Sequence, residues 1–170
     1  MSGQGDPNAP ADARAAHLVR TLGLQPHPEG GYFREVFRSE RDVRPGDARS
    51  VRSALTTIYF LLAAGQHSRW HRVASDEAWH HYEGDPLDLL WVDAENVLHR
   101  ATLGPVAPDQ QPVAVVPAGC WQAARPLGAY ALVGCTVGPG FDFADFEMLE
   151  AGTPEHERLR QVDAFPAGLL

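Results

Sequence analysis

Short runs of apolar residues, separated by turn-forming residues, dominate the middle of the chain. The runs are LTTIYFLLA, SRWHRVA, AWHHYEG, LDLLWVD, NVLHRATL, PVAVVP and AYALVGCTV, and the strand candidate YFREVF precedes them. Gly, Pro, Asp or Asn lies between most of these runs, and DAEN has the composition of a hairpin turn. Residues 40–53 are charged and are expected to form a loop. Many short strands with regular turns predict a β-sandwich or barrel rather than alternating strands and helices.

Helical patterns occur only near the two ends of the chain. DARAAHLVRTLGL reads as a helix that Asp12 caps and that Gly23 ends in a left-handed conformation. TPEHERLRQV reads as a short helix with Thr153 as its cap. The Gly-, Pro- and Ala-rich residues 1–11 are expected to be a disordered tail. These patterns predict one all-β domain over residues 12–170, with short flanking α-helices.

The charge of the chain narrows the possible partners. The sequence has 170 residues, of which 22 are acidic and 14 are basic, so the formal net charge is −8. An acidic chain without a run of Lys or Arg argues against binding to nucleic acid or to an anionic membrane surface. No stretch of about 18 apolar residues exists, so no membrane span is expected, and the first residues lack a secretory pattern.

The two cysteines bear on the expected compartment. Cys120 and Cys135 do not form a CxxC motif. We expect both to be reduced, buried thiols in a cytoplasmic protein. A disulfide, or a nucleophilic role for Cys120 after the PAG turn, is the alternative.

The segment HRVASDEAWHHYEG, residues 71–84, carries the chemistry that the sequence suggests. Alternate residues of a strand share a face, so His71 and Val73 should point the same way, and Glu77 can return to that side across a short turn. An imidazole and a carboxylate suit a divalent transition metal, although two ligands alone bind weakly. The same pair also suits proton transfer, with the carboxylate orienting the ring.

The spacing in this segment resembles the first motif of the cupin family. That motif is a Gly, five residues, His-x-His, three or four residues, a Glu, six residues and a Gly. The chain has Gly65, His71, Val73, Glu77 and Gly84 at the matching positions, and only the second His is replaced.

A second cupin motif is also present in altered form. The family has Pro-x-Gly-x-x-His, and this chain has Pro117, Gly119 and Gln122 at the matching positions. The segments HPEGGYFREVFRS, HRVASDEAWHHYEGDPL, VPAGCWQAA and GCTVGPGFDFADFEM together resemble the uncharacterised DUF985, or cupin-5, branch over roughly residues 20–150. The resemblance implies a cupin double-stranded β-helix, which is a jelly-roll barrel with its ligand site inside. It also implies a homodimer that pairs the early strand after EGG.

The resemblance implies a modified metal site. In cupins the two motifs ligate a metal, and the matching residues here are His71, Glu77 and Gln122. Val73 has no donor atom, and the carbonyl oxygen of Gln122 is a poorer ligand than imidazole. Two expectations follow for the cofactor: either none is required, or one divalent transition metal binds.

Three functions are compatible with these residues. The first is an isomerase, epimerase or lyase that acts on a sugar or sugar-nucleotide-like metabolite, with His71 and Glu77 as catalytic residues, since metal-free epimerases occur among cupins. The second is a non-catalytic protein that binds a small ligand. The third is a metal-dependent cupin enzyme with an altered ligand set. The expected partner is a small molecule in each case.

Several further side chains are candidates for contact with the ligand. They are Tyr32, Arg34, Trp79, His80, His81, Trp121 and Gln122. Tyr32 and Arg34 alternate on one strand, so they either face the ligand together or belong to an outer sheet face. The two tryptophans either form the floor of a pocket or belong to the core.

The orientation of the adjacent histidines depends on the regularity of their strand. If Glu77 faces inward, strict alternation puts Trp79 and His81 inward and His80 outward, and a bulge reverses that order. At most one of the two histidines should line the site. Glu29 precedes two glycines and is either a turn residue or a ligand contact. The remaining histidines are expected at the surface, namely His17, His27, His99 and His156.

Overall fold

The computed structural model describes residues 13–170, so the expected tail and the cap Asp12 lie outside the described residues. Its helices are α1 (Ala13–Leu22) and α2 (Pro154–Leu159), with the 3-10 helices η1 (Phe143–Asp145) and η2 (Ala167–Leu169). Its strands are β1 (Gln25–Pro26), β2 (Tyr32–Arg38), β3 (Asp42–Val43), β4 (Arg52–Ser53), β5 (Thr56–Ala63), β6 (Ser68–Val73), β7 (Asp76–Gly84), β8 (Leu87–Val92), β9 (Leu98–Leu103), β10 (Val113–Val116), β11 (Trp121–Pro126), β12 (Tyr130–Gly138) and β13 (Phe146–Met148). No helix in this part of the chain is long and apolar enough to cross a membrane.

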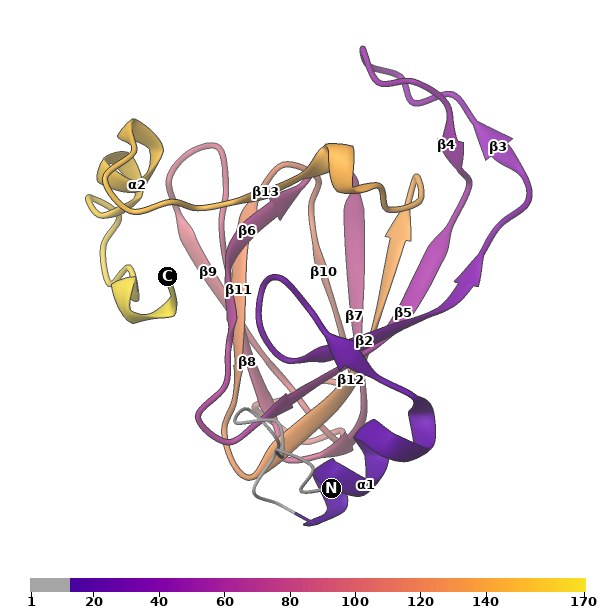
Figure 1. Cartoon of the computed structure of the whole chain (residues 1–170). Helices are drawn as coiled ribbons and strands as arrows, with labels where there is room; N and C mark the ends of the chain where they lie inside the picture. The colour runs from indigo at the N-terminus through magenta and orange to yellow at the C-terminus, as the bar shows by residue number, and fades with distance from the viewer. Residues whose placement is uncertain (1–12) are drawn as a thin grey trace, which may run out of the picture.

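Two antiparallel sheets form the barrel that Figure 1 shows. The larger sheet has the order β1-β2-β5-β12-β7-β10, and the smaller one has the order β13-β6-β11-β8-β9. Consecutive strands β5 to β9 alternate between the two sheets for most of this region, as in a jelly roll. The all-β fold that the apolar runs predict is therefore confirmed. Strand β11 was not predicted, because its alanines give little alternation. The two- and three-residue strands β1, β3, β4 and β13 were also not predicted, because they are too short for a pattern.

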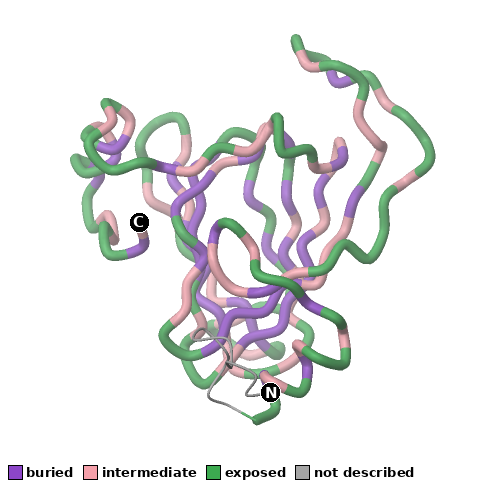
Figure 2. The backbone as a smooth tube through the Cα atoms, viewed as in Figure 1, coloured by how far each residue is buried: buried purple, intermediate pink, exposed green. Residues whose placement is uncertain are grey.

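Three apolar clusters hold the barrel and its additions together (Figure 2). The central cluster fills the space between the sheets and includes Phe60, Trp79 and Leu89. A second cluster lies between the smaller sheet and the C-terminal segment, and a third lies between α1 and the larger sheet. Because α1 covers the outer face of β5, that strand is apolar on both faces, and Leu61 is as buried as Phe60.

The helix ends follow the expected chemistry. Gly23 follows α1 with a φ of +63°, the left-handed conformation that glycine adopts without a steric cost. The Thr153 hydroxyl accepts a hydrogen bond from the backbone N–H of His156 at 3.2 Å and so caps α2. Both predictions from the sequence are confirmed.

The charged segment at residues 40–53 forms an extension that carries β3 and β4. Arg52 donates two hydrogen bonds of 2.8 Å to the carboxylate of Asp145, and Arg49 donates a third one at 3.3 Å. These bonds tie the extension to η1, because Asp145 is the last residue of that helix.

The turn before β2 sets the position of the loop that carries the functional residues. Gly31 has a φ of +67°, and a Cβ there would lie 2.6 Å from the carbonyl oxygen of Leu61. The backbone N–H of Arg69 donates to the carbonyl oxygen of Glu29 at 2.8 Å. The loop therefore packs directly against the barrel wall, and only glycine fits at its closest approach.

We predict that Gly31→Ala destabilises the fold more than Gly65→Ala does. Both residues have a positive φ, which costs alanine about 1 kcal/mol, but nothing lies within 4 Å of a Cβ at Gly65. The contact with Leu61 should add about 2 kcal/mol to the loss at Gly31. Urea unfolding of the two variants measures this difference, and equal losses would contradict the close packing of the loop.

Candidate acid–base site

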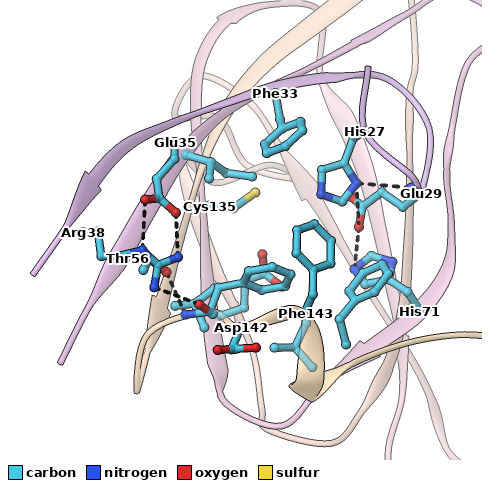
Figure 3. Close-up of a pocket in the computed structure, with 16 residues that line it drawn as sticks. His27, Glu29, Phe33, Glu35, Arg38, Thr56, His71, Cys135, Asp142 and Phe143 are labelled. Carbon is cyan, nitrogen blue, oxygen red and sulfur yellow. Dashed lines mark hydrogen bonds and ion pairs between the residues drawn. The ribbon is translucent and has the colours of Figure 1, made fainter. Parts of the chain in front are cut away.

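A cavity of about 270 Å³ lies between the two sheets (Figure 3). Five buried side chains with polar atoms gather at one end of it, and we call them the acid–base cluster: His27, Glu29, His71, Glu77 and Cys135. Phenylalanines form much of the remaining wall, and Glu35 and Arg38 lie on the opposite side. The cavity thus has a buried polar end and a largely aromatic wall.

His71 is held by its own strand, β6. Its Nδ1 lies 2.8 Å from the backbone carbonyl oxygen of Arg69. Because a carbonyl oxygen only accepts, Nδ1 carries the proton and Nε2 presents a lone pair. Burial lowers the pKa of His71 in spite of the nearby Glu77 carboxylate, so the ring is neutral.

Glu29 faces that lone pair from the loop before β2. Its Oε2 lies 3.1 Å from Nε2 of His71. Burial raises the pKa of Glu29 to about 8, although the Ser68 hydroxyl and Arg69 oppose the shift. At neutral pH the carboxyl is therefore protonated and donates its O–H to the imidazole, and the pair shares one proton.

Glu77 projects into the cavity from β7. The side-chain amide of Gln122 donates a hydrogen bond to its Oε2, and the thiol of Cys135 makes a second hydrogen bond to this carboxyl. Burial raises the pKa of Glu77 to about 7, because the opposing effects of His71, Gln122 and Cys135 are smaller. Both protonation states are therefore populated near neutral pH, which suits a general base.

The expectation of a surface position is wrong for His156, which is buried in α2, and also for His27. Its side chain is only 6% exposed, and its Nδ1 accepts the backbone N–H of Glu29 at 3.1 Å. Burial, followed by the nearby His71, lowers the pKa of His27 to about 3, so the ring is neutral and its proton sits on Nε2. The glycine turn folds this ring inward, where its edge meets Phe33 at 4.5 Å between centroids.

The aromatic wall comes mainly from the segment after β12. Phe141 packs edge-on against Phe143, with 4.9 Å between ring centroids, and Phe146 lies within 6 Å of both rings. Beside them, Arg38 holds Glu35 with two hydrogen bonds of 2.7 and 3.0 Å and donates a third one to the carbonyl oxygen of Phe141. Three of the five N–H groups of this guanidinium are thus used by the protein.

The two predicted catalytic residues, His71 and Glu77, lie in one cavity, but the predicted ligand contacts lie outside its lining. Tyr32 is buried beneath α1, and Arg34 lies over the ring of Tyr59 at 6.0 Å on the outer sheet face. Alternation along β2 puts Phe33 and Glu35 on the cavity side instead, because the helix covers the other face. The placement of Tyr32 and Arg34 against a ligand is therefore corrected.

Trp79 and Gln122 lie in the layer behind Glu77. The Trp79 N–H donates to Oε1 of Gln122 at 3.1 Å, which leaves the amide nitrogen for Glu77. Trp121 faces the opposite side of β11, where it packs with the C-terminal segment and donates to Glu155 at 2.7 Å. The strand reverses its side chains at each residue, so Gln122 and Trp121 cannot both face inward.

Neither adjacent histidine lines the cavity. His80 lies on the outer face and stacks on Tyr82 at 6.5 Å, whereas His81 bonds to the carbonyl oxygen of Asp85 at 3.2 Å. A register shift near Tyr82 interrupts the alternation of β7 before the strand ends.

The family's metal-ligand set does not fit this cavity. Val73 lines the wall where the second histidine of the motif would stand, and it offers no donor atom. Both polar atoms of the Gln122 amide are used, one by Glu77 and one by Trp79. Within residues 13–170, no group of three or more His, Cys, Asp and Glu side chains has the arrangement of a metal site.

The sequence analysis missed His27 as a site residue, together with Phe33, Glu35, Arg38, Cys135 and the phenylalanines after β12. Two segments of the family resemblance, HPEGGYFREVFRS and GCTVGPGFDFADFEM, contain nearly all of them. Local pattern did not reveal them, because they meet only when distant segments fold together.

We predict that Glu29→Gln flattens the pH dependence of stability. The carboxyl ionises near pH 4.5 in the unfolded chain and near pH 8 in the fold, so the fold holds an extra proton between these values. The free energy of unfolding therefore falls as the pH rises through this window, by about 2 kcal/mol between about pH 6 and pH 8. Gln cannot ionise, so the variant should lack this loss in denaturant titrations.

The exposed Glu95→Gln serves as the matched control and should give a curve parallel to that of the wild type. A parallel curve for Glu29→Gln as well would mean that Glu29 is ionised in the fold.

Comparison with known proteins identifies the family. The model for the cupin superfamily (DUF985) matches residues 16–149. A hypothetical protein from Leishmania major shares 32% identity with a TM-score of 0.79, and the match covers 88% of this chain and 94% of that one. A protein from Shewanella oneidensis shares 34% identity with a TM-score of 0.73, over 86% and 94% of the two chains.

More distant likeness extends to the fold alone. A variant of oxalate decarboxylase from Bacillus subtilis is 16% identical with a TM-score of 0.56, and the match covers 81% of this chain but 36% of that one. No curated protein matches the sequence. Given the family match over most of its length, the chain belongs to the DUF985 family of the cupin superfamily.

Proposed function

We propose that this cupin is an acid–base enzyme, of the isomerase, epimerase or lyase class, that acts on a small sugar-like metabolite in the barrel. One observation carries the proposal. His71 and Glu77 enter the same buried cavity, and each is oriented by a protein group, the Arg69 carbonyl and the Gln122 amide. Side chains fixed in this way are available for proton transfer to a bound ligand.

Glu77 serves as the base in the proposed reaction. Its carboxylate removes a proton from the carbon next to a carbonyl group of the ligand. The shared proton of Glu29 and His71 moves to the carbonyl oxygen, so that an enol forms and charge does not accumulate. Glu77 then returns its proton to the former carbonyl carbon, while the hydroxyl on the first carbon gives its proton to the pair of Glu29 and His71, so that the carbonyl moves by one carbon. Epimerisation would instead need solvent water to protonate the opposite face while Glu77 releases its proton to solvent. No oxidant or co-reactant is consumed in either case.

Two other functions of the same cavity are alternatives, and each predicts a different experimental result. A non-catalytic binding protein would use the cavity without proton transfer. A metal-dependent enzyme would need donors that Val73 and Gln122 do not supply. No step of the proposed reaction therefore runs through a metal.

We also propose that the protein is a cytoplasmic homodimer. The free thiols Cys120 and Cys135 support a reducing compartment.

The larger sheet offers a face for the second copy. Where α1 leaves its outer face uncovered, Phe37, Tyr82, Val113 and Val115 are between 42% and 52% exposed. On β10 the alternate residues Ala114 and Val116 face the core. Two chains that each carry a charge of −8 repel one another least where no carboxylates meet, and this set of side chains has none. Strand β2, next to the two-residue border strand β1, is the early strand after EGG. The family resemblance implies that this strand pairs with the second copy.

We predict that Glu77→Gln slows proton exchange by about 10²- to 10⁴-fold. Wild-type protein is incubated in D₂O with glyceraldehyde, dihydroxyacetone, arabinose and fructose, and deuterium at the carbon next to the carbonyl is followed by NMR. The wild-type rate should rise with pH through about 7, because the base acts as the carboxylate. Glu95→Gln, at an exposed turn, should match the wild type.

His71→Ala separates an enzyme from a binding protein. The variant should lose exchange while the folded barrel persists by circular dichroism. Binding without any exchange by the wild type would favour the non-catalytic alternative. Stoichiometric metal in the native protein, lost together with activity on chelation, would favour the metal-dependent one.

We predict that Val115→Asp converts the dimer into a monomer. The change places two carboxylates in an apolar contact, whereas Val106→Asp, at a residue that is 85% exposed in a loop, should not affect assembly. Light scattering after gel filtration gives the masses. A monomeric wild type, or a dimeric Val115→Asp variant, would contradict the proposed interface.

A further inference from the structure

We infer that the cavity selects an uncharged ring compound, whose carbonyl or hydroxyl oxygen meets the acid–base cluster while its apolar face lies on the aromatic wall. Carboxylates and phosphates are excluded from the buried end. The inference deepens the proposed function and rests on the same cavity. It concerns what the cavity binds, so it can be tested apart from catalysis.

The distribution of cations is the first argument. All 14 basic residues of the chain are Arg, and all of them lie within residues 13–170. Among them only Arg38 lines the cavity, on the side away from the cluster. Its Nε, Nη1 and Nη2 atoms already donate to Glu35 and to the Phe141 carbonyl. The buried end therefore has no guanidinium beside it, and an anion there would lie away from the one arginine of the cavity lining, which already uses three of its five N–H groups.

The acid–base cluster itself is unsuited to an anion. Glu29 and Glu77 are carboxyl groups, which are never positively charged. His27 and His71 are neutral rings whose Nδ1 atoms are already hydrogen-bonded to the backbone. An anionic group placed here would lose its hydration without gaining a counter-charge, which costs far more than the burial of a neutral hydroxyl or carbonyl. A neutral hydroxyl group, by contrast, can donate to a carboxylate, and a carbonyl oxygen can accept from Nε2–H of His27.

The apolar side of the cavity explains why the ligand should have a ring. Val73 and Ile58 extend the apolar lining beyond the phenylalanines, and Val73 does so beside His71 on the same strand. A flat apolar face packs well against aromatic rings, as the C–H face of a sugar or a cyclic ketone does. A ligand that is polar on all sides would leave this wall without a partner.

The volume sets an upper limit on size. About 270 Å³ lies just below the range of about 300–1,000 Å³ that is typical of pockets for drug-sized ligands. This space accommodates a single sugar-sized ring. A sugar nucleotide would have to leave its phosphates and base outside, so the free sugar-like compound is favoured over its nucleotide form.

Isosteric amide and carboxylate pairs test the charge selectivity directly. The probes are benzamide with benzoate and glucuronamide with glucuronate, because the members of each pair differ mainly in charge. Binding to the full chain at about pH 7.5 is measured by ligand-observed NMR. We expect the amide of at least one pair to bind about tenfold or more tightly than its carboxylate, a difference of about 1.4 kcal/mol.

Two variants show where the selectivity arises. Glu77→Gln removes an ionisable carboxyl from the cluster and should reduce the difference in affinity between the amide and the carboxylate of each pair. Phe146→Ala removes part of the aromatic wall and should weaken the binding of benzamide by about tenfold, while the amide still binds more tightly than the carboxylate. Circular dichroism confirms that each variant remains folded.

The outcomes separate this inference from the proposed function. Carboxylates that bind as tightly as the amides would overturn the inference, and loss of that binding in Arg38→Gln would show that Arg38 releases Glu35 to hold the anion. Preference for amides without any exchange activity would support the inference and overturn only the catalytic proposal. Failure of both members of every pair to bind would overturn the inference, whereas the catalytic proposal would still be decided by the exchange measurement.

Discussion

The hydrogen bond between Glu29 and His71 is the contact on which the site depends. It joins the loop before β2 to strand β6, which belongs to the other sheet, and it does so inside the barrel. The bond forms only because Gly31 allows the loop to approach Leu61 closely. Without this approach, His27 and Glu29 would lie in solvent, and the cavity would lose the neutral, proton-sharing end that distinguishes it.

Burial is the physical effect that turns these ordinary residues into a set of proton donors and acceptors. It raises the pKa of both Glu29 and Glu77 and lowers the pKa of both His27 and His71. All four shifts favour the uncharged form, since burial removes the hydration that would stabilise a charge. Burial therefore accounts both for the selection of a neutral ligand and for pKa values that allow proton transfer near neutral pH.

Much of the fold could be predicted from the sequence because it depends on local patterns. The apolar runs became strands, and Gly23 and Thr153 ended and began helices as their chemistry requires. Alternation correctly put His71 and Val73 on one face. Alternation alone did not determine which face of β2 is inward, because this depends on the packing of α1 against the outer face of the strand.

The candidate site was only partly predictable for a related reason. His71 and Glu77 are close in sequence, so a short turn brings them together. His27 and Glu29 reach the cavity through a contact with a distant strand, and the phenylalanines after β12 reach it beside η1, which Arg52 and Arg49 tie to the extension. The hydrophobic periodicity of a single segment does not indicate which distant segment it will contact.

The Gln122 amide has a consequence for how the protein responds to its surroundings. An imidazole at this position would change its charge with pH and compete for metal ions. A primary amide does neither, and its orientation is fixed because its oxygen accepts from Trp79. Glu77 therefore keeps the same hydrogen-bond donor on this side at every pH, while its own carboxyl still titrates near neutrality. The altered motif exchanges a group that can ionise and bind metal for a fixed donor.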